Sequence, residues 1–294
     1  MKQADFGQIV KFLRKKTSDK KGNPWTRESL SNHLHLSINQ LGRLERGDRK
    51  YLDRQTLKIL ADAFNLTPIE RKEFLIAAAG ITNEDYSYYI TPEEQLKDLL
   101  DALNKIWSPA IVIDAFQNLV AANKPYQDLF MVTQELIDYG RQNPIKLNLL
   151  YVTYAEELGL RDLIGPYWRE VALIQIHHFR RTSFRYQHHD YYKLLVDELF
   201  KLPQFDIDWY ASHRAPFDKY QQYLRYNYEH PAYGPLNYIG TVTIVNSMYG
   251  ELNLIIYNPI DFATSAVFFQ LARSEIRQIV RLAEWPIKPN SPQT

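Results

Sequence analysis

The 294-residue chain contains no cysteine. This excludes disulfides, thiolate metal sites and cysteine nucleophiles, and it fits a reducing compartment such as the cytoplasm, where we expect the protein to act. Long apolar runs are also missing. Apolar runs such as Ala110-Ile111-Val112-Ile113 fall far short of the ~20 residues that a membrane span needs. The N-terminus is charged and amphipathic, so the sequence predicts neither a signal peptide nor a membrane partner.

Motifs of catalysis and phosphate binding are absent from the sequence as well. It has no G-x-x-x-x-G-K-[ST], G-x-G-x-x-G, H-E-x-x-H or G-x-S-x-G stretch. The adjacent pairs His177-His178 and His188-His189 suit a metal poorly, because neighbours on a helix point ~100° apart. We therefore predict no catalytic site, no metal site and no cofactor.

Charge divides the chain into two parts. Residues 1–80 contain 16 Lys or Arg against 9 Asp or Glu, whereas the remainder contains 19 against 25. Such an asymmetry indicates a polyanionic partner for the basic part. A solvated charged surface is the alternative interpretation, and charge alone does not decide between the two.

Apolar periodicity predicts five helices before residue 80. Phe6, Ile9, Val10 and Leu13 mark the stripe of the first. A short helix from Ser37 to about Arg46 ends at Gly47, a residue type common just after a helix C-terminus. Of the other three predicted helices, one starts near Thr26, one carries the stripe Leu57-Leu60-Ala61-Phe64, and one begins at Thr67-Pro68.

The rest of the chain has a mixed pattern. Short strands are predicted at Ala110–Ile113 and Asn118–Ala122, and a later antiparallel pair at Thr241–Asn246 and Glu251–Tyr257. Helices fill the interval, at Tyr126–Tyr139, Leu147–Leu158, Pro166–Phe184 and Tyr191–Leu199, and another is predicted at Asp261–Ala283. Strands at both ends with helices between them indicate an α+β domain with a single sheet covered on a face. We predict a multidomain α and α+β protein, with a five-helix domain at 1–80, a linker at 81–90, an α+β domain at 91–285 and a flexible tail at 286–294.

The helix from Ser37 to Arg46 has the pattern of a DNA-reading element. At 100° per residue, Leu41 and Leu44 face one side while Asn39 and Arg43 face the other. Asn and Gln side chains can bond adenine, and Arg can bond guanine. Ser37 and Gln40 form a capping box that aims the positive helix end at a phosphate. The predicted DNA contacts are Arg27, Ser37, Asn39, Gln40, Arg43, Arg46, Arg49 and Lys50. Among them, Arg27, Arg46, Arg49 and Lys50 flank the reading face as candidate phosphate contacts. The alternative is that these residues form the solvated face of a small helical bundle.

The run from Trp25 to Gly47 resembles the Xre/Cro repressor-like family of bacterial and phage regulators. In that family the recognition helix typically ends in I-x-x-I-E-x-G, and here the stretch is Leu41-Gly42-Arg43-Leu44-Glu45-Arg46-Gly47. Gly42 departs from the pattern and weakens the helix by about 1 kcal/mol relative to Ala. The resemblance implies a helix-turn-helix domain that binds double-stranded operator DNA.

From residue 106 onward the chain resembles the ligand-binding domain of the MmyB-like regulators. The matching stretches are Ser108–Asp114, Trp168-Arg169-Glu170, Leu195–Leu199, Phe205–His213 and His230–Leu236. The resemblance implies a PAS-like sheet that holds a hydrophobic small molecule, with a fatty acid as the favoured class.

Aromatic residues allow such a ligand without requiring it. The chain has 5 Trp, 21 Tyr and 14 Phe, and their amphipathic rings suit a cavity that is apolar inside with a few polar tips. The candidate ligand-binding residues are Trp107, Phe116, Tyr126, Phe130, Trp168, Ile176 and Phe179, with His177 or Arg180 as a partner for a carboxylate. Ordinary core packing is the alternative for each of them.

The leading hypothesis is a ligand-responsive transcription regulator that acts as a homodimer held by its second domain. The rival hypothesis makes the second domain a dimerisation or partner-docking module with a filled core and no ligand. An enzyme with a DNA-binding appendage is a distant third.

Overall fold

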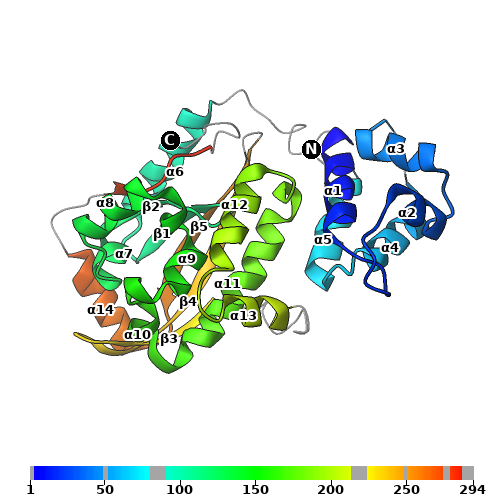
Figure 1. The fold of residues 1–294 in the computed structure, drawn as a ribbon. Helices are drawn as coiled ribbons and strands as arrows, with labels where there is room; N and C mark the ends of the chain where they lie inside the picture. The colour runs from blue at the N-terminus through cyan, green and yellow to red at the C-terminus, as the bar shows by residue number, and fades with distance from the viewer. Residues whose placement is uncertain are drawn as a thin grey trace. The chain divides into compact units, whose positions relative to one another are not determined.

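The computed structural model describes residues 3–48, 52–79, 91–212, 224–247, 250–273 and 279–286. The chain divides into two compact units, whose helices and strands are labelled in Figure 1. The first combines Met1–Tyr86 with Arg180–Leu194, and the second combines Ser87–Phe179 with Leu195–Thr294. A segment far along the chain thus belongs to the first unit, which the sequence analysis did not foresee.

The described residues before residue 80 form the five helices that periodicity predicts. They are α1 (Gln3–Lys16), α2 (Arg27–His33), α3 (Ile38–Arg46), α4 (Arg54–Ala63) and α5 (Pro68–Ala78). The four later helices each start at a capping side chain that accepts a backbone N–H, and these caps are Thr26, Ser37, Asp53 and Thr67. The caps satisfy N–H groups that the first turn of a helix leaves without a partner. The apolar stripes meet in one core, in which Ile9, Leu30, Leu41, Leu60 and Phe74 are fully buried.

Helices α1 and α3 approach each other closely at Gly7. A Cβ atom placed on Gly7 would lie 2.5 Å from the carbonyl oxygen of Leu44 and 2.9 Å from that of Glu45. These are backbone atoms, which cannot turn aside as a flexible side chain can. The packing of α1 on α3 therefore requires glycine at this position.

The segment Arg180–Leu194 completes the core of the first unit. It contains the end of α11 (Trp168–Ser183), a single 3-10 turn (Phe184–Tyr186) and the start of α12 (Asp190–Leu199). Phe184 is fully buried, and its ring centroid lies 6.4 Å from that of Phe74 in an edge-on arrangement. Arg180 Nη1 donates to Glu70 Oε1 at 2.9 Å, and both side chains are more than nine-tenths buried. An aromatic contact and a buried ion pair thus tie the segment to α5.

The second unit is built on an antiparallel sheet. Its strands in the described residues are β1 (Ala110–Asp114), β2 (Leu119–Ala122), β3 (Leu224–His230), β4 (Gly234–Ser247), β5 (Gly250–Pro259) and β6 (Val280–Arg281). Their order is β3-β4-β5-β1-β2-β6, so strands from both ends of the domain share one sheet, as the sequence predicted. The two groups of strands join where β1 pairs with β5, with Ile111 opposite Ile255.

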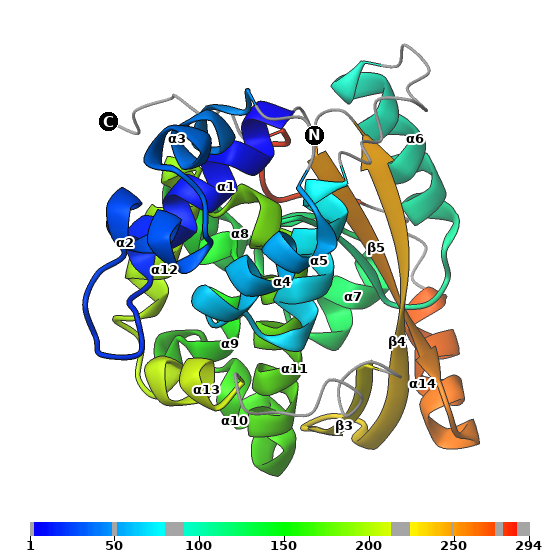
Figure 2. The same cartoon turned by 90° about the vertical axis from the view of Figure 1, so that its right-hand side faces the viewer.

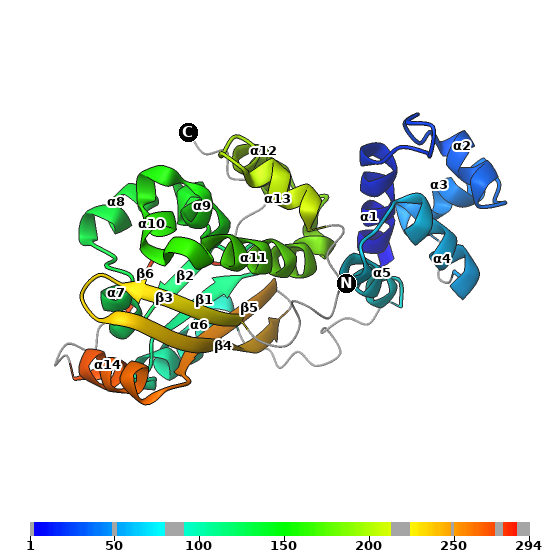
Figure 3. The same cartoon turned by 90° about the horizontal axis from the view of Figure 1, so that it is seen from below.

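Helices cover both faces of this sheet, so the prediction that a single face is covered was wrong. They are α6 (Pro92–Lys105), α7 (Lys124–Leu129), α8 (Gln134–Gln142), α9 (Leu149–Tyr154), α10 (Leu160–Ile164), α13 (Phe205–Ala211) and α14 (Phe262–Ala272), together with parts of α11 and α12. Side chains alternate between the faces of a strand. Val112 and Leu254 lie on the face that α6 covers with Leu96, Leu99 and Leu103. Figure 2 shows α6 on one side of β4 and β5 with α9 and α11 on the other, and Figure 3 shows α9 to α11 along β3.

Several observed elements differ from the predicted ones. The helix predicted at Tyr126–Tyr139 is interrupted, because Met131 has a left-handed φ of 49° and Thr133 caps a new helix, α8. The helix predicted from Asp261 ends at Ala272, and β6 begins at Val280. Strand β3 was not predicted at all. Among the described residues, no helix is both long and apolar enough to cross a bilayer.

Candidate functional site

The outer surface of α3 presents a compact set of hydrogen-bonding side chains. Asn39, Gln40 and Arg43 are exposed, whereas Leu41 and Leu44 on the opposite side are buried in the core. This is the orientation that the 100° period predicts. The helix is anchored by its apolar back and offers its polar front to a partner.

Both ends of α3 are capped. Ser37 Oγ accepts from the N–H of Gln40 at 3.2 Å, and Gln40 Oε1 accepts from the N–H of Ser37 at 2.8 Å. Gly47 ends the helix with a φ of 80°. The capping box uses one of the two lone pairs on the side-chain oxygen of Gln40, so this oxygen can accept one more hydrogen bond and the NH2 group can still donate. The cap fixes the orientation of the Gln40 amide, whereas Asn39 is under no such constraint from the cap.

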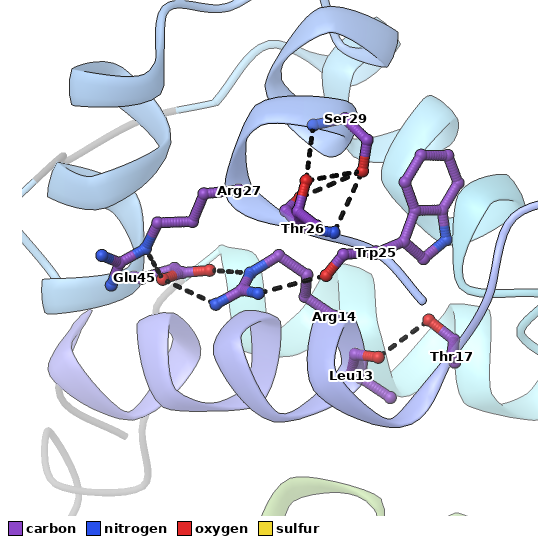
Figure 4. Close-up of polar contacts among 8 residues, drawn as sticks. All are labelled: Leu13, Arg14, Thr17, Trp25, Thr26, Arg27, Ser29 and Glu45. Carbon is purple, nitrogen blue, oxygen red and sulfur yellow. Dashed lines mark hydrogen bonds and ion pairs between the residues drawn. The ribbon is translucent and has the colours of Figure 1, made fainter. Parts of the chain in front are cut away.

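A buried carboxylate fixes α3 to the neighbouring helices (Figure 4). Glu45 lies 2.5 Å from Arg14 Nε and 2.7 Å from Arg27 Nε, and Arg14 Nη1 also donates to the carbonyl oxygen of Trp25 at 3.2 Å. Burial opposes the charge of Glu45, but the hydrogen bonds from Arg14 and Arg27 outweigh it and lower the pKa of its carboxyl. Glu45 thus joins α1, the start of α2 and α3.

Two of the predicted phosphate contacts already form ion pairs with carboxylates of the protein. Arg27 is bound to Glu45 yet remains half exposed, and Arg46 Nε lies 2.8 Å from Asp48 Oδ2 in an exposed pair. Both guanidiniums can turn toward a phosphate only by sharing or leaving a carboxylate. Arg49 and Lys50 lie outside the described residues.

The second unit contains a tyrosine cluster on the sheet face opposite α6. It comprises Tyr126, Phe130, Tyr226, Tyr228, Tyr238 and Tyr257. Tyr226 and Tyr238 are cross-strand partners with ring centroids 5.2 Å apart, and Tyr126 from α7 stacks on Tyr257 at 5.9 Å. Burial raises the pKa of Tyr126 and of Tyr228, so these hydroxyls stay protonated and can donate hydrogen bonds.

Several buried polar atoms of this unit have no hydrogen-bond partner among the described residues. They include Tyr228 Oη, Asn253 Oδ1 and Gln117 Oε1. The amide orientations are set, because Asn253 Nδ2 donates to Glu251 at 3.0 Å and Gln117 Nε2 donates to the carbonyl oxygen of Gln175 at 3.0 Å. An unsatisfied buried polar group costs about 1–3 kcal/mol, so each of these atoms favours a bound polar group.

The turn between β1 and β2 positions Gln117. Asp114 Oδ1 accepts from the N–H groups of Phe116 and Asn118, each at 2.9 Å, and Gln117 takes a left-handed φ of 65°. Burial raises the pKa of Asp114 to about 6 despite these hydrogen bonds. The turn holds the amide of Gln117 against α11.

A family model for the ligand-binding domain of MmyB-like transcription regulators matches residues 92–271, which is more than half of the chain. The chain belongs to the MmyB-like transcription regulators. The matched range runs from α6 into α14 and contains the tyrosine cluster. The family is one of ligand-binding domains of regulators, not of enzymes. The search of curated proteins gives no match.

Within the MmyB-like domain, the residues chosen from the sequence as ligand contacts do not form one site. Tyr126 and Phe130 lie together in the tyrosine cluster, with ring centroids 4.6 Å apart. Phe116, Ile176 and Phe179 are buried elsewhere, and Phe179 packs 6.1 Å from Trp209. Trp168 is also buried, and its Nε1 donates to the carbonyl oxygen of Thr153 at 2.7 Å.

Three further candidates lie apart from that cluster. Trp107 is 45% exposed and stacks on Phe269, so it is on the outer surface of the MmyB-like domain. Arg180 is ion-paired with Glu70 inside the first unit, and His177 is half-buried on α11. Tyr226, Tyr228 and Tyr238 were not among the candidates, although Tyr226, Tyr228 and His230 alternate with polar residues as a half-buried strand does.

Proposed function

We propose that this protein is a DNA-binding regulator of the Xre/Cro type, in which α2 and α3 form a helix-turn-helix. We further propose that its MmyB-like domain has a PAS-like fold, binds a hydrophobic small molecule such as a fatty acid, and thereby modulates DNA binding. The main support for DNA binding is helix α3, which is capped at both ends, buried on its apolar side and exposed at Asn39 and Arg43.

The chemistry of that surface suits a DNA major groove. An Arg side chain can donate two hydrogen bonds to guanine O6 and N7, and an Asn side chain can pair with adenine N6 and N7. The capped start of α3 directs the positive end of the helix dipole outward, where a phosphate is stabilised. The first 80 residues carry the basic excess that supplies phosphate contacts.

Replacing Arg43 with alanine is expected to lower affinity for the cognate operator by about 1–3 kcal/mol, because one base contact is lost. Binding to unrelated duplexes should change little. Fluorescence anisotropy across a salt titration measures both. The control is Arg141→Ala, which removes an exposed arginine from α8. Operator binding equal to that of the unaltered protein would show that Arg43 does not read DNA.

The ligand proposal is supported by the family and by the unpartnered polar atoms. The Tyr228 hydroxyl can donate to the carboxylate of a fatty acid, whose chain would lie among the aromatic rings. The close ring contacts of the tyrosine cluster favour the rival function, a docking module with a filled core. Detection of a bound molecule would distinguish the ligand-binding function from the docking-module function.

Native mass spectrometry of the full chain is expected to show an added mass of a few hundred daltons, in line with the volume of apolar ligand pockets. Organic extraction should remove that mass and lower the melting temperature. Added palmitate should then restore the melting temperature. Tyr228→Phe, which deletes only the unpartnered hydroxyl, should weaken this rescue. A protein that is free of added mass and unaffected by palmitate supports the docking-module function instead.

We also propose that the regulator acts as a homodimer. A single recognition helix reads only one half-site, and two linked copies gain affinity by engaging half-sites about one helical turn apart.

A further inference from the structure

Helix α14 has an outer surface unlike that of an ordinary solvent-exposed helix. Its eleven residues, Phe262–Ala272, include no charged side chain. Thr264, Phe268 and Leu271 face inward, where α14 packs against α7, β4 and β5. Phe262 is nevertheless 90% exposed and Phe269 56% exposed. The helix is therefore apolar on both sides, which in a globular domain marks a surface that a partner covers.

A neighbouring aromatic residue extends this surface. Trp107, just after α6, stacks on Phe269 with ring centroids 4.6 Å apart and ring planes only 4° from parallel. Ile260, just before the helix, is 41% exposed. We name Trp107, Ile260, Phe262, Ala266 and Phe269 the α14 face. It joins residues from two distant parts of the chain into one apolar patch.

The arrangement of the α14 face is self-complementary. Phe262 and Phe269 lie four residues before and three residues after the exposed Ala266, so all three occupy one side of the helix. Two antiparallel copies that cross at Ala266 place Phe262 of each against Phe269 of the other. The small Ala266 at the crossing allows the close axial approach that packed helices adopt. Such a contact uses the same patch on both copies, as a two-fold dimer requires.

The charges at the two ends of α14 fit the same arrangement. Asp261 caps the start of the helix, and the exposed Arg273, eleven residues after Phe262 on the same side, follows its end. An antiparallel pair brings Asp261 of each copy toward Arg273 of the other. Residues 81–294 carry 19 basic against 25 acidic side chains, a balance that opposes binding to an anionic membrane instead.

The exposed area is sufficient for association. The four large side chains of the α14 face leave roughly 450 Å² exposed per chain, given the 150–250 Å² that an aromatic side chain can bury. Two copies would thus cover about 900 Å² through these side chains alone, close to the ~1,000 Å² of a small specific interface. The flanking residues of α14 supply the remainder.

We propose that a second copy of this chain docks on the α14 face, in an antiparallel α14–α14 contact centred on Ala266. The proposal rests on the homodimer proposed above and names the surface that forms it. The dimer then places two copies of α3 in one assembly.

The absence of cysteine from the chain allows a direct test. In full-length Ala266→Cys, the new thiols of two copies lie at the crossing point, within the short Cα separation that a disulfide demands. Oxidation is expected to give a covalent dimer. Ile207→Cys, which places a thiol at a 59% exposed position of α13, is the matched control and should stay monomeric on a denaturing gel. Equal cross-linking of the two variants overturns the proposal.

Sedimentation of the cysteine-free protein provides the second measurement. The unaltered chain is expected to form dimers, and Phe269→Glu should weaken them about tenfold or more, while Ile207→Glu leaves them intact. A monomeric unaltered chain, or dimers that survive Phe269→Glu, overturns the proposal. So does a monomer that binds phosphatidylcholine vesicles through Phe262.

DNA binding is scored separately on a duplex with one half-site, which a monomer can bind. Phe269→Glu should keep this half-site affinity and lose the gain from a second half-site. If cross-linking and sedimentation behave as expected but no variant binds any duplex specifically, the interface stands and the proposed DNA-binding function fails.

Discussion

Replacing Arg180 with alanine is expected to destabilise the first unit by about 3–5 kcal/mol, because it removes one partner of a buried ion pair. Glu70 is only 6% exposed, so its carboxylate would lose the Arg180 guanidinium at 2.9 Å without gaining water. Glu70 also accepts the N–H of Thr67 at the start of α5, so the loss should spread to that helix. Urea unfolding of the full chain, followed by hydrogen exchange of the α1 and α5 amides, measures the change.

Two variants serve as controls for the Arg180 prediction. Arg141→Ala breaks an exposed pair with Asp138 and should cost less than about 1 kcal/mol. Replacing the pair together, by Arg180→Met with Glu70→Leu, should recover much of the lost stability, since no buried charge is then left alone. If Arg180→Ala costs no more than Arg141→Ala, the segment Arg180–Leu194 is not part of the first unit's stable core.

Replacing Glu45 with alanine is the second change with a large expected effect. Arg14, whose side chain is 10% exposed, would lose the carboxylate 2.5 Å away and remain as a buried charge. The expected cost is again about 3–5 kcal/mol, and operator binding should fall with it because α3 loses its link to α1. Arg27→Ala should cost at most about 1 kcal/mol, because that side chain is 47% exposed.

The pH dependence offers an independent check on Glu45. Its pKa is lower in the folded protein, so its contribution is present above the ordinary carboxyl pKa of 4.5 and is lost as pH falls through the folded value. Glu45→Ala should therefore flatten the acid limb of the stability profile measured by urea unfolding between pH 7 and 3. An unchanged acid limb, with little loss of stability at pH 7, would mean that the Glu45 pairs contribute nothing.

Features with local determinants could be predicted from the amino-acid sequence. The capping box of Ser37 and Gln40 spans three residues, and the outward direction of Asn39 and Arg43 follows from the helical period alone. The strands at both ends of the second domain could be predicted to share a sheet, because each has an apolar, β-branched pattern. Strand β3 carries a weaker signal, since its alternating positions hold Tyr and His in place of β-branched residues.

Contacts between residues far apart in the chain could not be predicted from the sequence and are seen in the folded structure. Gly7 has no side chain to contribute to a periodic pattern, yet the backbone of α3 leaves room for nothing larger. Arg180 and Phe184 fit the pattern of one continuous helix of the second domain, but they belong to the core that contains Glu70 and Phe74. Trp107 has the composition of a core residue but lies on the surface beside Phe269. Hydrophobic periodicity indicates which side of a helix or strand is apolar. It does not indicate which element covers that side, because this depends on contacts between residues far apart in the chain.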